Sequence, residues 1–138
     1  MKDSRLLVNS DLLVCFLTGN PPEQASHARE LFSDSSATKR TLIIIPTAVA
    51  FAVQRLESDY GLEVRPVAES MLALLSAGRN LEVKQQDLII PALEIHRDQS
   101  IPIDLAFLAA ATKAENAALV SCDPIGGTIE GIRKVDLG

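Results

Sequence analysis

Residues 41–61, TLIIIPTAVAFAVQRLESDYG, decide the fold class of this chain. Leu42–Ile45 is a continuous aliphatic run, rich in β-branched residues. Such a run is typical of a strand that is buried on both faces of a parallel sheet. Pro46 ends the strand, Thr47 can cap the following helix, and Gly61 ends that helix. The stretch therefore predicts a strand followed by a helix, the unit from which parallel sheets are built.

The same alternation of strand and helix signals continues on both sides of this stretch. The other expected strands are Arg5–Val8, Leu81–Val83, Leu119–Ser121 and Lys134–Leu137. The other expected helices lie within residues 11–19, 20–32, 66–77 and 86–97, and in the alanine-rich run that Asp104 opens. The pattern predicts an α/β fold, a three-layer α/β/α sandwich with a central, mainly parallel sheet. No linker or repeat divides residues 1–138, so we expect a single domain.

Composition and charge narrow the classes of function. The hydrophobic fraction is 47% and the charged fraction 22%, which indicates a globular chain rather than a disordered one. The net charge of -5 argues against a protein that coats nucleic acid non-specifically, because such binding relies on Lys and Arg. No apolar stretch is long enough to span a membrane. Cys15 and Cys122 lie in apolar runs and form no metal-binding pattern, so we expect buried free thiols in a cytoplasmic protein.

Polar residues follow the expected strands. Asn9 and Asp11 come after the first strand, and Asp123 comes after Leu119–Ser121. Asp104 follows an extended segment at the start of a helix. In an open parallel sheet, ligands bind at the carboxyl ends of the strands, and hard cations such as Mg²⁺ take oxygen ligands. Each residue also suits a turn or a helix cap, so spacing alone leaves a metal site and a purely structural role equally open.

At these positions the chain resembles the PIN-domain family, which includes the toxin nucleases of bacterial toxin–antitoxin pairs (VapC type). The resemblance spans nearly the whole chain and rests on the order of short motifs. These are Asn9-Ser10-Asp11 after a strand, Pro22-Glu23-Gln24-Ala25, Ile44-Ile45-Pro46, Asp104 before Ala109-Ala110-Ala111, and Leu119-Val120-Ser121-Cys122-Asp123.

The resemblance implies a metal-dependent endoribonuclease that hydrolyses phosphodiester bonds with Mg²⁺ or Mn²⁺. It implies catalytic roles for Asp104, Asp123, Asp11 and Asn9, with Asp104, Asp123 and Asn9 as metal ligands. RNA phosphates would be met by nearby cations, and the candidates are Arg5, Lys113 and Arg133. The resemblance further implies RNA and an antitoxin-like protein as partners, and a homodimer.

The sequence departs from the family pattern at two expected acids. The family's first aspartate falls on Asn9, and its glutamate in the helix after the second strand falls near Phe51. Glu57 lies about 9 Å further along that helix, at about 1.5 Å per residue, which is too far for a simple replacement. Losing two carboxylates should weaken binding of a hard cation, since ligand charge supplies much of its affinity.

Two other functions therefore stand beside the nuclease. The first is a PIN-like module that binds nucleic acid, a protein or a second copy of itself without catalysis. The wide apolar face of Val67–Leu75 fits either the core or such an interface. The second is an unrelated α/β domain with a small-ligand site, although the chain has no glycine-rich phosphate loop.

Overall fold

The computed structural model describes residues 4–33, 40–78, 80–122 and 129–135. Its elements, in chain order, are β1 (Arg5–Leu7), α1 (Ser10–Thr18), α2 (Pro22–Ser33), β2 (Thr41–Ile44), α3 (Pro46–Ser58), α4 (Val64–Ala77), β3 (Leu81–Val83), α5 (Gln86–Gln99), α6 (Ile103–Ala114), β4 (Leu119–Val120) and β5 (Lys134–Val135). The predicted alternation of helices and strands is confirmed, and the fold is mixed α/β with parallel strands.

Local signals set most of the boundaries. Gly19 ends α1 in the left-handed conformation, at φ 73°, and its N–H donates to the carbonyl oxygen of Cys15 at 2.8 Å. Glycine adopts this conformation without steric strain. Pro46 is the first residue of α3, where its missing N–H costs nothing, so the expected cap Thr47 lies inside the first turn. α5 continues through Pro91.

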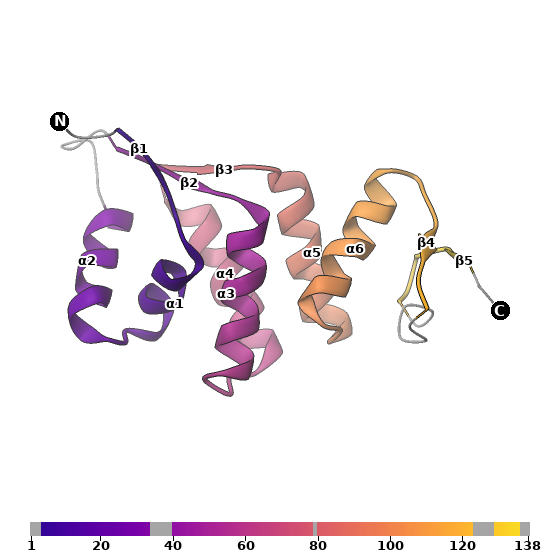
Figure 1. Ribbon diagram of the computed structural model, residues 1–138, viewed down its shortest axis with the longest axis horizontal. Helices are drawn as coiled ribbons and strands as arrows, with labels where there is room; N and C mark the ends of the chain where they lie inside the picture. Colours follow the sequence, from indigo (N-terminus) through magenta and orange to yellow (C-terminus); the bar gives the residue numbers. More distant parts are fainter. Residues whose placement is uncertain (1–3, 34–39, 79, 123–128, 136–138) are drawn as a thin grey trace.

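Strands β1, β2 and β3 form a parallel sheet in that order. Leu42 and Ile44 on β2 are fully buried and face the helices, which lie on one side of the strands in Figure 1. Alternate side chains point to the opposite face. That outer face is open to solvent, since Leu7 on β1 is 65% exposed and Glu82 on β3 is only half-buried.

Strands β4 and β5 form a second, separate parallel pair, with Leu119 beside Lys134 and Val120 beside Val135. In Figure 1 this pair lies beyond α6, at the opposite end of the molecule from β1. The strands of the described segments therefore form two sheets, where the sequence led us to expect one central sheet.

The core is aliphatic, as the scarcity of aromatic residues requires. Its largest fully buried side chains are Leu13, Leu42, Ile44, Leu56, Met71, Ile89 and Leu93. The apolar face of α4 belongs to this core, because Val67, Ala68, Met71, Leu74 and Leu75 are all buried. Cys15 is buried as expected, whereas Cys122 is exposed. Among the described residues, no helix combines the length and the apolar character needed to cross a membrane.

Candidate active-site cleft

The residues predicted at the end of the first strand lie at the start of α1. Asn9 is the N-cap residue, and its Oδ1 atom accepts a hydrogen bond from the N–H of Ser10 at 2.7 Å. Asp11 stands in the first turn of the helix and is exposed. A carboxylate in the first turn is favourable because it faces the positive end of the helix dipole. Both residues thus have a structural role at this position.

Asp104 lies in the first turn of α6 and is exposed. The helix begins one residue earlier than predicted, at Ile103, with Pro102 in the N-cap position. Asp104 therefore does not cap the helix through its side chain, and its carboxylate is available to the surface. Asp123, the fourth predicted catalytic residue, lies outside the described residues.

A cleft of about 480 Å³ separates the second half of α3 from the start of α6. α3 contributes Ala50, Phe51, Gln54, Glu57 and Ser58, and the other wall consists of Pro102, Ile103 and Asp104. Two carboxylates, those of Glu57 and Asp104, thus line the same cleft. Asn9 and Asp11 are not among its lining residues. The structure therefore separates the predicted site into a pair at α1 and a single aspartate at this cleft.

Phe51 lines the cleft at the position where the family resemblance places an acid. Its side chain is 56% exposed, so it does not belong to the core. A phenyl ring exposed to this extent has no packing role that requires it. It offers an apolar face beside the two carboxylates.

Glu57 is fixed in place by a buried histidine. The Nε2 atom of His96, on α5, lies 2.6 Å from Oε2 of Glu57, and its Nδ1 atom lies 2.5 Å from the carbonyl oxygen of Ile101. A carbonyl oxygen only accepts hydrogen bonds, so Nδ1 is the donor in its contact with Ile101. His96 is 1% exposed, so this contact is shielded from water.

Sequence reasoning assigned no role to His96 and placed Glu57 too far along the helix for a simple replacement of the missing acid. The two residues are separated by 39 positions and carry no motif. Only the packing of α3 against α5 brings them together. The one available signal was a histidine in an apolar helix, Ile89 to Ile95, which indicates a buried imidazole that needs partners.

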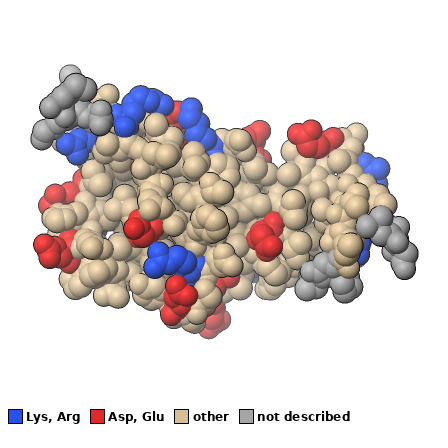
Figure 2. Space-filling view, viewed as in Figure 1, with Lys and Arg blue, Asp and Glu red and all other residues tan. Residues whose placement is uncertain are grey.

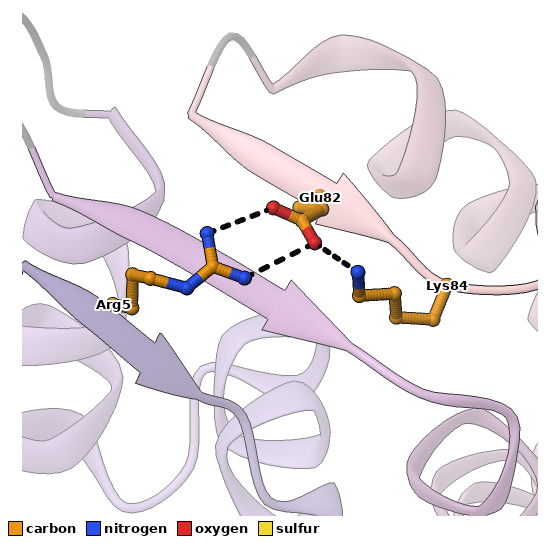
Figure 3. A network of polar contacts seen from close by, with 3 residues as sticks. All are labelled: Arg5, Glu82 and Lys84. Carbon is orange, nitrogen blue, oxygen red and sulfur yellow. Dashed lines mark hydrogen bonds and ion pairs between the residues drawn. The ribbon is translucent and has the colours of Figure 1, made fainter.

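The predicted phosphate-binding residue Arg5 is already paired. Its two terminal nitrogens donate to the carboxylate of Glu82 at 3.1 and 3.2 Å, across β2, and Lys84 contacts the same carboxylate (Figure 3). Hydrogen bonds from Arg5 and then from Lys84 lower the pKa of Glu82 to about 2. Figure 2 shows Lys and Arg gathered over the region where Figure 1 places this sheet.

Lys113 and Arg133 lie together at the other end of the molecule. Both line a small pocket between the end of α6 and the segment before β5. The guanidinium of Arg133 donates to the carbonyl oxygens of Asn116 and Ala117, each at 3.3 Å. These carbonyls belong to the segment that follows α6, so Arg133 ties this segment to the residues before β5. The three predicted cations therefore do not form one surface.

The donor set of the cleft suits a hard divalent cation in part. Two carboxylates and the amide of Gln54 are oxygen donors of the kind that Mg²⁺ and Mn²⁺ accept, with water completing the coordination. His96 contacts the Oε2 atom of Glu57, so Oε1 is not engaged in this contact. In the described parts of the chain, no group of three or more His, Cys, Asp or Glu side chains is placed to hold a metal ion.

A comparison of the chain with models of protein families and with curated proteins gives no match.

Proposed function

We propose that this chain is a PIN-like domain that acts as a metal-dependent endoribonuclease with a reduced set of ligands. The cleft between α3 and α6 supports this proposal, because it brings Glu57 and Asp104 to one surface. This chain has Phe51 where the family pattern has an acid. Glu57 supplies a carboxylate further along the same helix. RNA is the proposed substrate, and Mg²⁺ or Mn²⁺ the proposed ion.

In this proposal Asp104 and Glu57 hold the ion, and Gln54 supports its water shell. A bound divalent ion lowers the pKa of a coordinated water and stabilises the leaving oxygen of a phosphodiester. The contact between His96 and Glu57 fixes the orientation of the carboxylate, a common arrangement around metal ligands. Phe51 presents its ring to an unpaired base, because stacking on aromatic side chains holds single strands without reading their sequence.

Calorimetric titration of Mg²⁺ and Mn²⁺ tests the metal site. We expect a dissociation constant between micromolar and low millimolar, weakened at least about 10-fold in Asp104→Asn and in Glu57→Gln, since each removes a charged ligand. Asp59→Asn is the matched control, because Asp59 is an exposed acid at the end of α3 that does not line the cleft. Absence of binding up to about 10 mM would contradict the proposal, since millimolar constants already mark weak natural sites.

Cleavage of single-stranded RNA is the second measurement. We expect hydrolysis that requires Mn²⁺ or Mg²⁺ and is lost in Asp104→Asn, while Asp59→Asn cleaves normally. In this proposal, an antitoxin-like protein is the natural inhibitor of the activity. The nuclease itself acts in the cytoplasm. Asp11, Asn9 and Asp123 are tested by the same assay, with Asn substituted for each aspartate and Ala for Asn9.

A binding module without catalysis is the second candidate, and two observations favour it. The Oδ1 atom of Asn9 is occupied by the N–H of Ser10, so it is not presented to a metal ion. The exposed ring of Phe51 suits a bound base or a partner protein better than a metal site. RNA binding that persists in EDTA, without cleavage in Mn²⁺, would support this candidate over the nuclease.

A further inference from the structure

A second pocket, of about 300 Å³, lies between the α1–α2 pair and the end of α4. Its walls include Phe16 of α1, Arg29 and Phe32 of α2, and Leu74 and Ala77 of α4. None of these residues lines the cleft between α3 and α6. Figure 1 places α2 at the end of the molecule that is remote from α6. The pocket is therefore separate from the candidate active site.

Two of the four phenylalanines of the chain meet at this pocket. The ring centroids of Phe16 and Phe32 lie 4.7 Å apart, and the ring planes are inclined by 52°. Phe32 and Leu74 belong to the buried core, whereas Phe16 is only partly buried. Aromatic rings offer a large apolar contact area and pack well against other rings. The walls therefore favour a ligand with an aromatic or branched apolar group.

Arg29 is the charged residue in the lining of this pocket, and it is exposed. In the described parts of the chain, no carboxylate forms an ion pair with its guanidinium. Arg5, Arg55, Arg65 and Arg97, by contrast, each pair with a carboxylate. A guanidinium binds a carboxylate through two parallel hydrogen bonds. The pocket thus combines apolar walls with one cation that has its donors available.

The surroundings of the pocket favour a small molecule over a protein chain. Small-ligand pockets begin at about 300 Å³, whereas a stable protein interface buries roughly 800 Å² on each partner. The exposed face of α2 carries polar residues, among them Glu23, Ser26, His27 and Glu30. Among the described residues, none of the strongly exposed large apolar side chains lines the pocket. The apolar surface therefore ends at the walls of the pocket.

We propose that this pocket binds a small organic carboxylic acid that carries an aromatic or branched apolar group. The apolar group packs against Phe16, Phe32 and Leu74, and the carboxylate pairs with Arg29. A carboxylate matches the charge of one guanidinium, whereas a phosphate dianion would keep an uncompensated charge beside apolar walls. The site is independent of the proposed nuclease function and needs neither metal nor RNA.

Two-dimensional NMR spectra of the backbone amides, recorded during a titration with phenylpropionate, test the site. We expect the amide signals of Ala77 and Gly78 to shift, with a dissociation constant of about 0.1 to 1 mM for a ligand of this size. Phenylpropanol has the same ring without the charge and should bind at least about 5-fold more weakly. Acetate has the charge without the ring and should cause no shifts at these concentrations.

Two results of this titration would overturn the proposal. Absence of shifts up to about 10 mM phenylpropionate would leave the pocket to a larger occupant, such as a protein segment. Shifts centred on Phe51 and Asp104 would place the acid in the cleft between α3 and α6 instead.

Arg29→Gln separates the charge from the apolar walls. Because Arg29 is exposed, the substitution should leave the fold intact. We expect the affinity for phenylpropionate to fall about 10-fold, while the affinity for phenylpropanol stays the same. Arg65→Gln is the matched control, since Arg65 lies in the first turn of α4 and does not line the pocket. An Arg29→Gln variant that binds the acid as tightly as the natural protein would overturn the proposal.

Phe16→Leu tests the aromatic wall. The substitution keeps an apolar side chain but removes the ring, so it should weaken phenylpropionate and phenylpropanol alike, about 3-fold. Phe107→Leu is the matched control, a partly buried phenylalanine of α6 that does not line the pocket. The same spectra report whether each variant is folded. Equal affinities of the two variants would overturn the contact of the ligand with Phe16.

Discussion

His96 of α5 and Glu57 of α3 are joined by a 2.6 Å contact between Nε2 and Oε2. The imidazole is 1% exposed, and its second nitrogen faces the carbonyl oxygen of Ile101. This pair links two helices of the core to one wall of the cleft. It therefore couples the stability of the fold to the position of a candidate ligand.

Removing Glu57 should destabilise the protein, because the buried Nε2 atom of His96 would lose its partner. For Glu57→Ala we expect a loss of about 2 to 3 kcal/mol in the free energy of unfolding. Gln54→Ala, one turn earlier and exposed on the same helix, should change it by less than about 0.5 kcal/mol. Urea denaturation of the three proteins measures both values. Equal stabilities of the two variants would show that the His96 contact contributes nothing.

The network of Arg5, Glu82 and Lys84 predicts a stability that depends on pH. The pKa of Glu82 is lowered to about 2 in the folded protein, so the folded state favours the charged carboxylate relative to the unfolded chain. This contribution is fully present above the ordinary carboxyl pKa of about 4.5 and is lost as the pH falls from there to about 2.

Urea denaturation between pH 2 and pH 7 tests this. The difference in stability between the natural protein and Glu82→Gln should be largest near neutral pH and should shrink through the window from about 4.5 to 2. Arg5→Gln removes the main cause of the lowered pKa and should remove most of the same pH dependence. A difference that stays constant across this window would contradict the prediction.

Substitutions of Gly19 test whether its left-handed conformation is needed to end α1. Its φ of 73° lies in the left-handed region, and an added Cβ would meet nothing within 4 Å. The cost of Gly19→Ala is therefore backbone strain alone, about 1 to 2 kcal/mol. Gly19→Asn should cost about half as much, because asparagine adopts this conformation more readily. Thermal denaturation ranks the two variants, and a clash-driven effect would instead penalise the larger Asn side chain more.

Short-range signals in the sequence predicted most of the elements. The aliphatic run Leu42–Ile45, the break at Pro46 and the stop at Gly19 each act through a few neighbouring residues. The separation of β4–β5 from β1 could not be predicted in this way. Strand pairing between distant segments depends on how α5 and α6 pack, and no local pattern in Leu119–Ser121 specifies its partner.

The candidate site was predicted unevenly for the same reason. Asp104 follows an extended segment and opens a helix, so its exposed place in the first turn followed from local sequence. The approach of Glu57 to the same cleft, and its bond to His96, depend on the packing of α3 against α5 and α6. Asn9 caps α1 and Asp11 lies in its first turn. The sequence had left such a structural role and a role in a metal site equally open.

A substitution of Phe51 distinguishes a role of this residue in RNA binding from a role in folding. Because its side chain is 56% exposed, Phe51→Ala should change the free energy of unfolding by less than about 1 kcal/mol. If the ring stacks on a base, the same change should weaken binding of a short single-stranded RNA about 10-fold, since one stacked base contributes about 1 to 3 kcal/mol. Tyr60→Ala is the matched control, an exposed aromatic residue that does not line the cleft. Fluorescence anisotropy in EDTA measures both affinities without cleavage. Equal affinities of the Phe51 and Tyr60 variants would place RNA away from the cleft, whereas selective loss at Phe51 would place a base beside Asp104.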